Sequence, residues 1–77
     1  MPENGAIAVD ATRLAELLDL SVRTIRRLDT SGKLPRPVRI GGAVRWRVHE
    51  IDAWLAAGCP RREQWESMRS QESASRH

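Results

Sequence analysis

The chain is poor in cysteine, in aromatic residues and in long apolar runs. Its one cysteine, Cys59, excludes an intrachain disulfide and a cysteine-based zinc site. It has no Phe or Tyr and only three Trp, a composition that disfavours single-stranded RNA or DNA as the ligand, because readers of single strands stack bases on exposed aromatic side chains. No apolar run approaches the ~18 residues of a membrane-spanning helix, and no signal-peptide pattern is present. These absences predict a cytoplasmic protein that does not contact a membrane.

The small size of the chain also limits what it can do. A chain of 77 residues forms one small domain, because at this length only about 60% of the unfolded surface is buried. No nucleophile, base and orienting group gather anywhere in the sequence. The two histidines, His49 and His77, stand far apart and without metal-ligating neighbours. The sequence therefore predicts no enzyme, no metal site and no cofactor.

Arginine is abundant, and the positive charge is concentrated in one block. Residues 1–19 carry one base and four acids, a net charge of −3, whereas residues 20–50 carry eight bases and two acids, a net charge of +6. Of the 13 basic residues 12 are arginine, whose planar guanidinium binds phosphate or guanine through paired hydrogen bonds. Such a block is typical of a nucleic-acid-binding surface.

Two short helical patterns with good capping residues predict a helix-turn-helix. Asp10 is the N-cap candidate of the first helix, and Ser21 is that of the second. The second helix should end at Gly32, because Pro35 and Pro37 prevent its continuation. An ordinary helical hairpin shares this pattern, so the capping residues alone do not distinguish the two.

The second predicted helix combines an apolar arc with a basic face. Val22, Ile25 and Leu28 recur at helical spacing, and Arg23 and Arg27 lie opposite them. Two arginines at this i,i+4 spacing repel each other, and the single acid of the helix lies in its last turn, the unfavourable end of the helix dipole. A solvent-exposed face whose charges are unfavourable for the isolated helix is expected to bind an anionic partner. The side chains predicted on or beside this face are Ser21, Arg23, Thr24, Arg26 and Arg27.

Residues 38–48 alternate between apolar and basic residues around a Gly-Gly pair, which predicts a β-hairpin. A two-residue loop would put Arg39 on the same face as Val44. A three-residue loop that adds Ala43 would pair residue 39 with residue 45 and collect all arginines on one face. We prefer the second register because it separates charge from core, although it places Arg39 opposite Arg45. The hairpin would form a wing beside the helix-turn-helix.

The ends of the chain complete the predicted domain. Residues 7–9 are either a short strand or an apolar lead-in, and residues 1–6 are expected to be flexible. A third helix should follow the hairpin, with His49 as its N-cap and Trp54 closing the core. Residues 59–77 then form an extension, with a short helix over 61–69 and disorder from residue 70.

Trp65 and Met68 are spaced i,i+3 in this extension. Two interpretations remain open for them. The pair either packs on the core of its own domain or contacts a second protomer or a partner protein. The second interpretation gives the chain an alternative role as an adaptor that docks an integrase or RNA polymerase.

The segments LAELLDLSVRTIRRL, GKLPRPVRIGG, VRWR and EIDAWL occur in this order within residues 7–57. In this arrangement the chain resembles the excisionase/AlpA-type branch of the MerR-like winged helix-turn-helix domains. The resemblance implies a mainly α fold with a small β-hairpin: a helix-turn-helix, a two-stranded wing and a third helix, over residues 7–58. It also implies a bacterial or phage protein that binds double-stranded DNA, either as an excisionase in DNA recombination or as a small transcriptional regulator.

The resemblance further implies which residues meet DNA. It places Ser21, Arg23, Thr24 and Arg27 on a recognition helix, and Arg39 and Arg45 on the wing. The chain departs from the family pattern in three places: Asp19 stands where a turn glycine is common, Arg26 where an aromatic is frequent, and His49 where a Ser-like cap is usual. From their positions in the basic block, Lys33, Arg36 and Arg47 are added as phosphate contacts. A domain this small covers few base pairs, so we expect a dimer or a cooperative array on DNA.

Overall fold

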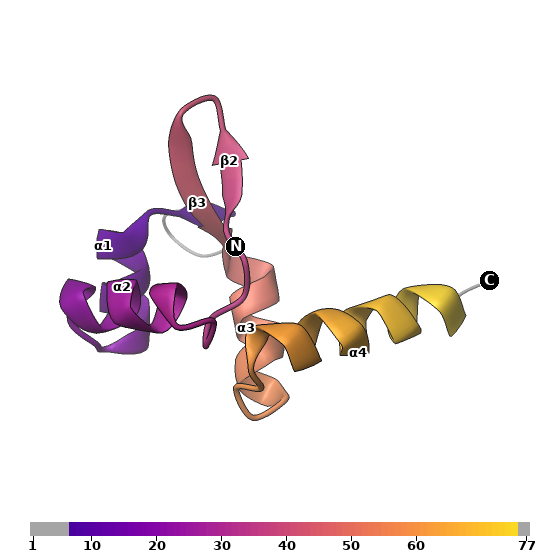
Figure 1. The fold of residues 1–77 in the computed structure, drawn as a ribbon. Coiled ribbons are helices and arrows are strands. Elements are labelled where there is room, and N and C mark those ends of the chain that lie inside the picture. Colours follow the sequence, from indigo (N-terminus) through magenta and orange to yellow (C-terminus); the bar gives the residue numbers. More distant parts are fainter. Residues whose placement is uncertain (1–6, 76–77) are drawn as a thin grey trace.

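The computed structural model describes the backbone of residues 7–75 and the side chains of residues 7–70 (Figure 1). The predicted flexibility of residues 1–6 falls outside the described residues. Within residues 7–75, four helices and a small three-stranded antiparallel sheet confirm the predicted winged helix-turn-helix fold. In chain order the elements are β1 (Ala8–Val9), α1 (Ala11–Leu18), α2 (Val22–Thr30), β2 (Val38–Ile40), β3 (Ala43–Arg47), α3 (Val48–Ala56) and α4 (Arg62–Ser75).

The helix-turn-helix forms where the capping residues predicted it. The Asp10 side chain accepts a hydrogen bond from the Arg13 backbone N–H at 2.9 Å, and so caps α1. Between the two helices Asp19 adopts the left-handed conformation, with φ 57°, which Asp tolerates better than most residues. The backbone N–H of Leu20 then bonds to the Ala15 carbonyl at 2.9 Å and closes the end of α1. An aspartate therefore makes the turn that glycine usually makes.

Helix α2 ends at Thr30, and the predicted glycine follows two residues later. Gly32 has φ 71°, and the Lys33 backbone N–H bonds to the Leu28 carbonyl at 2.8 Å. This left-handed C-terminal motif satisfies carbonyls that the helix itself leaves free. It turns the chain toward Leu34, which is fully buried.

The core lies between the helix-turn-helix, the sheet and α3. Leu14 of α1 and Ile25 of α2 have no exposed surface. The three tryptophans, at positions 46, 54 and 65, are each no more than 6% exposed. Each indole N–H has an acceptor: the Pro35 carbonyl, the Pro60 carbonyl and the Glu50 carboxylate, at 2.8–3.0 Å. The core thus stays compact with no unsatisfied indole donor.

The sheet has the strand order β1-β3-β2, so the first of the two alternatives for residues 7–9, a short strand, is confirmed. The preferred hairpin register is wrong. Arg39 pairs with Val44, and Ile40 pairs with Ala43, which leaves a two-residue Gly-Gly loop. Positive φ at the first loop residue, Gly41 at 65°, fits the type II′ turns that favour such short loops.

The reason for this register lies in where the wing sits. A three-residue loop would be favoured if one face of the hairpin packed on the core and the other faced solvent. The wing instead projects beyond the core (Figure 1), and Ile40 near its tip is 60% exposed. Arg39 beside Val44 is exposed as well, so this pairing buries no charge.

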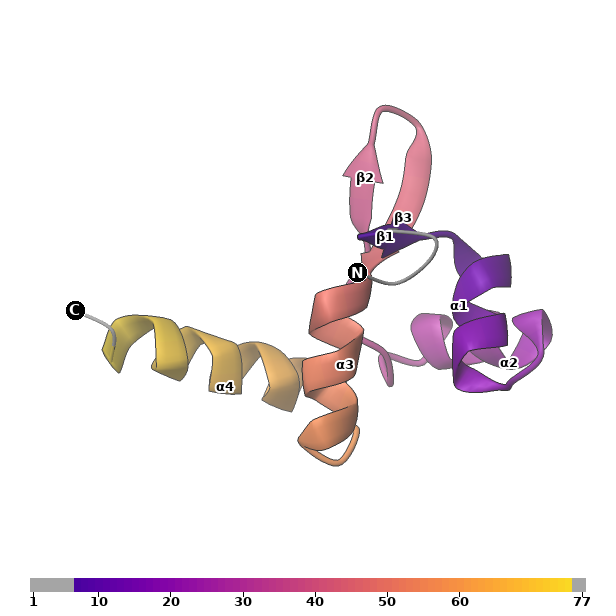
Figure 2. The same ribbon diagram turned by 180° about the vertical axis from the view of Figure 1, so that it is seen from behind.

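The second half of the chain differs from prediction at two helices. Helix α3 follows β3 without a loop, and its N-cap is Arg47, so His49 lies inside the first turn and is not the cap. Helix α4 runs to Ser75, so residues 70–75 are helical rather than disordered as their composition predicted. It projects away from α1 and α2, as the view from behind also shows (Figure 2). Within residues 7–75, no helix combines the length and the apolar character needed to span a membrane.

Candidate nucleic-acid interface

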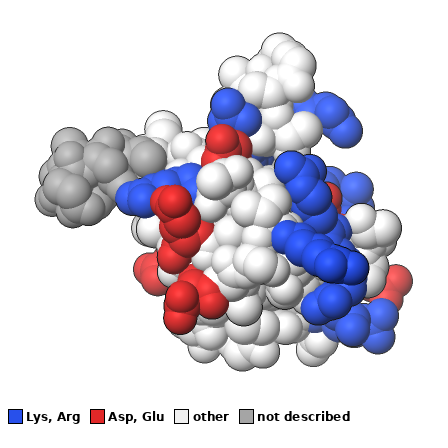
Figure 3. Space-filling view, turned by 90° about the vertical axis from the view of Figure 1, so that its left-hand side faces the viewer, with Lys and Arg blue, Asp and Glu red and all other residues white. Residues whose placement is uncertain are grey.

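The exposed face of α2 carries three arginines at helical spacing. Ile25 is fully buried against the core, which directs Arg23, Arg26 and Arg27 to solvent. None of the three forms an ion pair with any side chain among residues 7–70. In Figure 3 a band of basic atoms runs below the wing on the right of the view. Most acidic atoms on this face lie on the left of the view. The three guanidinium groups are therefore available to bind an external anion.

The hydroxyl groups at the start of α2 are engaged with each other. Ser21 accepts a hydrogen bond from the Thr24 backbone N–H at 3.0 Å, and it donates to the Thr24 hydroxyl at 2.9 Å. The Ser21 side chain therefore caps the helix, and the Thr24 hydroxyl holds the Ser21 hydroxyl in place. Each hydroxyl oxygen can still accept a further hydrogen bond, but the bonds that it makes in this structure stabilise the start of α2.

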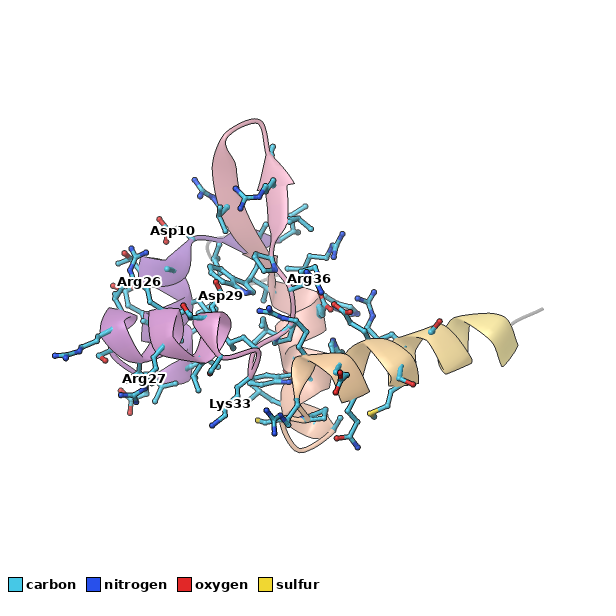
Figure 4. All side chains as sticks on the ribbon, viewed as in Figure 1. Asp10, Arg26, Arg27, Asp29, Lys33 and Arg36 are labelled. Atoms are coloured by element: carbon cyan, nitrogen blue, oxygen red, sulfur yellow. The ribbon has the colours of Figure 1, made fainter. Side chains whose placement is uncertain are left out.

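A groove of about 580 Å³ separates α2 from the wing. Arg26 lines it from α2 and Arg45 lines it from β3, and the acids Asp10 and Asp29 also line it. Figure 4 shows Arg26 and Asp10 on the same side of the helix-turn-helix, whereas Arg27 points away from the wing. Arg26 therefore belongs to the groove, and Arg27 belongs to the outer surface of α2.

The wing arginines do not share one face. Opposed residues of an antiparallel pair lie on the same face, and neighbours along a strand alternate. Because Arg39 is opposite Val44, Arg39 and Arg45 lie on opposite faces of the hairpin, and Figure 3 shows basic atoms on both sides of the wing. Arg45 also donates to the Val44 carbonyl at 2.8 Å. The predicted single arginine face of the wing is thus wrong, and only Arg45 lines the groove.

Three other predicted DNA contacts lie apart from this groove. Arg36 pairs with Glu66 at 3.0 Å, and Arg47 pairs with Glu50 at 3.4 Å. In Figure 4 Lys33 points away from the wing, and it lines a different, apolar groove. None of these three side chains lines the groove between α2 and the wing.

An ion pair that the sequence did not reveal joins α4 to the end of α2. Arg62 donates to the Asp29 carboxylate at 2.7 Å and to the Leu34 carbonyl at 2.9 Å. Its backbone N–H also bonds to the Gly32 carbonyl at 3.0 Å. Asp29 lines the α2–wing groove, so Arg62 neutralises an acid at its edge. The partners are 33 residues apart in sequence, and no local spacing signals such a pair.

A second acid, Glu50, organises the start of α3. Its side chain is only 8% exposed and accepts hydrogen bonds from Trp65 at 2.9 Å and Arg69 at 2.7 Å, in addition to Arg47. Trp65 is 6% exposed and belongs to the core, which favours intramolecular packing over the predicted partner contact. Met68 is 39% exposed on α4.

A cationic helix of a helix-turn-helix, with a wing beside it, defines the winged helix-turn-helix class of nucleic-acid-binding domains. Residues 10–59, which make up 50 of the 77 residues, match the family model described as a helix-turn-helix domain. The chain belongs to this family, and membership implies DNA binding. No curated protein and no solved structure matches the chain.

Proposed function

We propose that this protein binds double-stranded DNA sequence-specifically, with α2 in the major groove. The observation that carries the proposal is the set of exposed arginines on α2, which form no ion pair within residues 7–70 and lie beside the groove between α2 and the wing. The major groove is about 12 Å wide and admits one helix. Arg23 and Arg27, on the outer surface of α2, would meet base edges there. An arginine that bonds guanine O6 and N7 contributes about 1–3 kcal/mol of discrimination against other bases.

The α2–wing groove would hold one sugar–phosphate strand. Arg26 and Arg45 line it from two different elements, so both guanidinium groups can reach phosphate oxygens on the same strand. Arg39, on the other face of the wing, would contact the backbone or the edge of the neighbouring minor groove. Contacts to phosphate fix the position of the domain on DNA, and contacts to bases give it sequence preference.

The biological role proposed for this surface is that of an excisionase or a small transcriptional regulator. The support is the sequence resemblance to the excisionase/AlpA-type, MerR-like domains of bacteria and phages. Both roles use one DNA-reading surface, and they differ in whether the bound site is an attachment site or a promoter. The adaptor role through Trp65 loses its support, because that side chain is buried within the domain.

The proposal is tested by selecting bound sequences from a pool of random duplexes and measuring affinity by fluorescence anisotropy. We expect a defined consensus, which Arg27→Ala should relax, whereas Arg26→Ala should weaken consensus and random duplexes by a similar factor. Arg13→Ala is the matched control, since this arginine pairs with Glu16 on α1 and should not affect binding. If the pool yields no consensus, or if Arg27→Ala binds like Arg13→Ala, the proposal is wrong.

A further inference from the structure

Exposed apolar side chains are concentrated on one side of the molecule, away from the α2–wing groove. Six large hydrophobic residues are exposed in the described part of the chain. Four of them line two adjoining grooves beside α1 and α3: Ile7 (83% exposed), Leu17 (47%), Leu20 (43%) and Leu55 (45%). The other two are Ile40 near the wing tip and Met68 on α4. Scattered exposed leucines are common, but a contiguous group marks a binding surface.

The two grooves form one continuous strip. The first has a volume of about 370 Å³ and the second of about 520 Å³, and Leu18 and Leu55 line both. No residue of either groove lines the α2–wing groove. We call this surface, made by the residues of the two grooves, the apolar strip.

The two grooves that make up the apolar strip carry opposite charges, one at each half of the strip. Lys33 and Arg61 line its first groove, and Asp52 lines its second. None of these three forms an ion pair within residues 7–70. A surface with an apolar centre, a basic end and an acidic end is complementary to a copy of itself turned by 180°, because the rotation brings each basic end to the partner's acidic end.

We propose that the apolar strip is the interface of a two-fold symmetric dimer of this chain. The symmetry axis passes near Leu18 and Leu55, and Lys33 and Arg61 of each protomer face Asp52 of the other. A two-fold interface uses the same patch on both subunits, which the charge arrangement of this strip satisfies. The dimer forms without DNA, so its test does not depend on the proposed function.

The expected association is moderate. A standard interface buries about 800 Å² per partner, roughly one seventh of the 5697 Å² surface of this chain. Four half-exposed or exposed apolar side chains give a smaller contact, of the kind found in transient complexes. We expect a dissociation constant on the order of 10 µM, so sedimentation equilibrium of the full chain between about 5 and 500 µM covers the transition.

Leu55→Glu tests the apolar centre. It places a charge in the middle of the strip. Because Leu55 is 45% exposed, the fold should persist, and circular dichroism of the variant checks this independently. We expect the dissociation constant to rise at least tenfold. Ile40→Glu is the matched control on the wing and should leave it unchanged. A chain that stays monomeric at 500 µM overturns the proposal, as does a dimer that tolerates Leu55→Glu or is lost on Met68→Glu.

Charge exchange tests the orientation. Asp52→Lys alone, and Lys33→Glu with Arg61→Glu, should each weaken the dimer about three- to tenfold, because each places like charges opposite each other. Combining all three substitutions should restore the dissociation constant to within about twofold of wild type. Failure of the combined variant to recover contradicts the two-fold arrangement, even if the Leu55→Glu result holds.

Discussion

Replacing Arg62 by Ala tests whether α4 is an integral part of the DNA-binding domain. Arg62 is 20% exposed, Asp29 is 34% exposed, and their closest atoms are 2.7 Å apart. Arg62 also donates to the Leu34 carbonyl. Fully exposed pairs contribute about 0.2–1 kcal/mol, whereas hydrogen bonds to charged groups at partly buried sites contribute about 1.5–3 kcal/mol. We therefore expect Arg62→Ala to lower the free energy of unfolding by about 2 kcal/mol.

Urea denaturation followed by tryptophan fluorescence measures this loss, and a thermal scan should show a decrease in Tm of roughly 8–16 °C. Arg36→Ala is the matched control, because Arg36 also joins the α2–β2 connection to α4 but its pair with Glu66 is exposed on both sides. It should cost less than about 0.5 kcal/mol. A double-mutant cycle with Asp29→Asn should give a coupling energy of about 1 kcal/mol.

The same variants report on DNA binding. Without Arg62, the Asp29 carboxylate lies unneutralised at the edge of the α2–wing groove. A unit charge about 8 Å from a phosphate costs about 0.5–1 kcal/mol at effective dielectric constants between 40 and 80, so affinity should fall two- to fivefold. Asp29→Asn should restore affinity in the Arg62→Ala background. The reasoning is refuted if Arg62→Ala behaves like Arg36→Ala in unfolding, or if Asp29→Asn does not restore DNA affinity.

Three further predictions follow from single residues. Trp65→Ala should cost about 3–5 kcal/mol of unfolding free energy, whereas Trp65→Phe, which removes the hydrogen bond to Glu50, should cost less than half of that; chemical denaturation distinguishes them. Asp19→Val should destabilise by about 1–2 kcal/mol in the same assay, because a β-branched residue at φ 57° is strained, and Asp19→Gly should be neutral or stabilising. Arg45→Ala should reduce the magnitude of the log–log salt slope of DNA binding by about 0.9, the value for one phosphate contact, and an unchanged slope would exclude Arg45 from the interface.

The elements that the sequence predicted correctly are those specified by local chemistry. Asp10 and Ser21 are good caps because their side chains reach backbone N–H groups three residues ahead. Gly32 ends α2 because it adopts positive φ at little cost. The amphipathic spacing of α2 likewise assigned Ile25 to the core and the arginines to solvent. All these signals act within one or two helical turns.

The features that could not be predicted depend on where elements lie in space. The hairpin register differs from the prediction because the wing projects beyond the core, where Arg39 and Val44 can share a face without burying charge. The pairing of Asp29 with Arg62 spans 33 residues and arises only once α4 packs against the end of α2. Trp65 was ambiguous for the same reason, since its spacing to Met68 fits both a core contact and a partner contact.

Nuclear magnetic resonance of the 15N-labelled chain, titrated with a duplex chosen by the selection experiment, tests the central proposal most directly. We expect the largest amide and arginine side-chain shift changes at α2, with smaller changes at Arg45 and the wing tip, and little change around Leu17 and Leu55 on α1 and α3. Shifts confined to α3 and α4, with α2 unaffected at saturating DNA, would contradict the proposal that α2 and the wing form the DNA-binding surface.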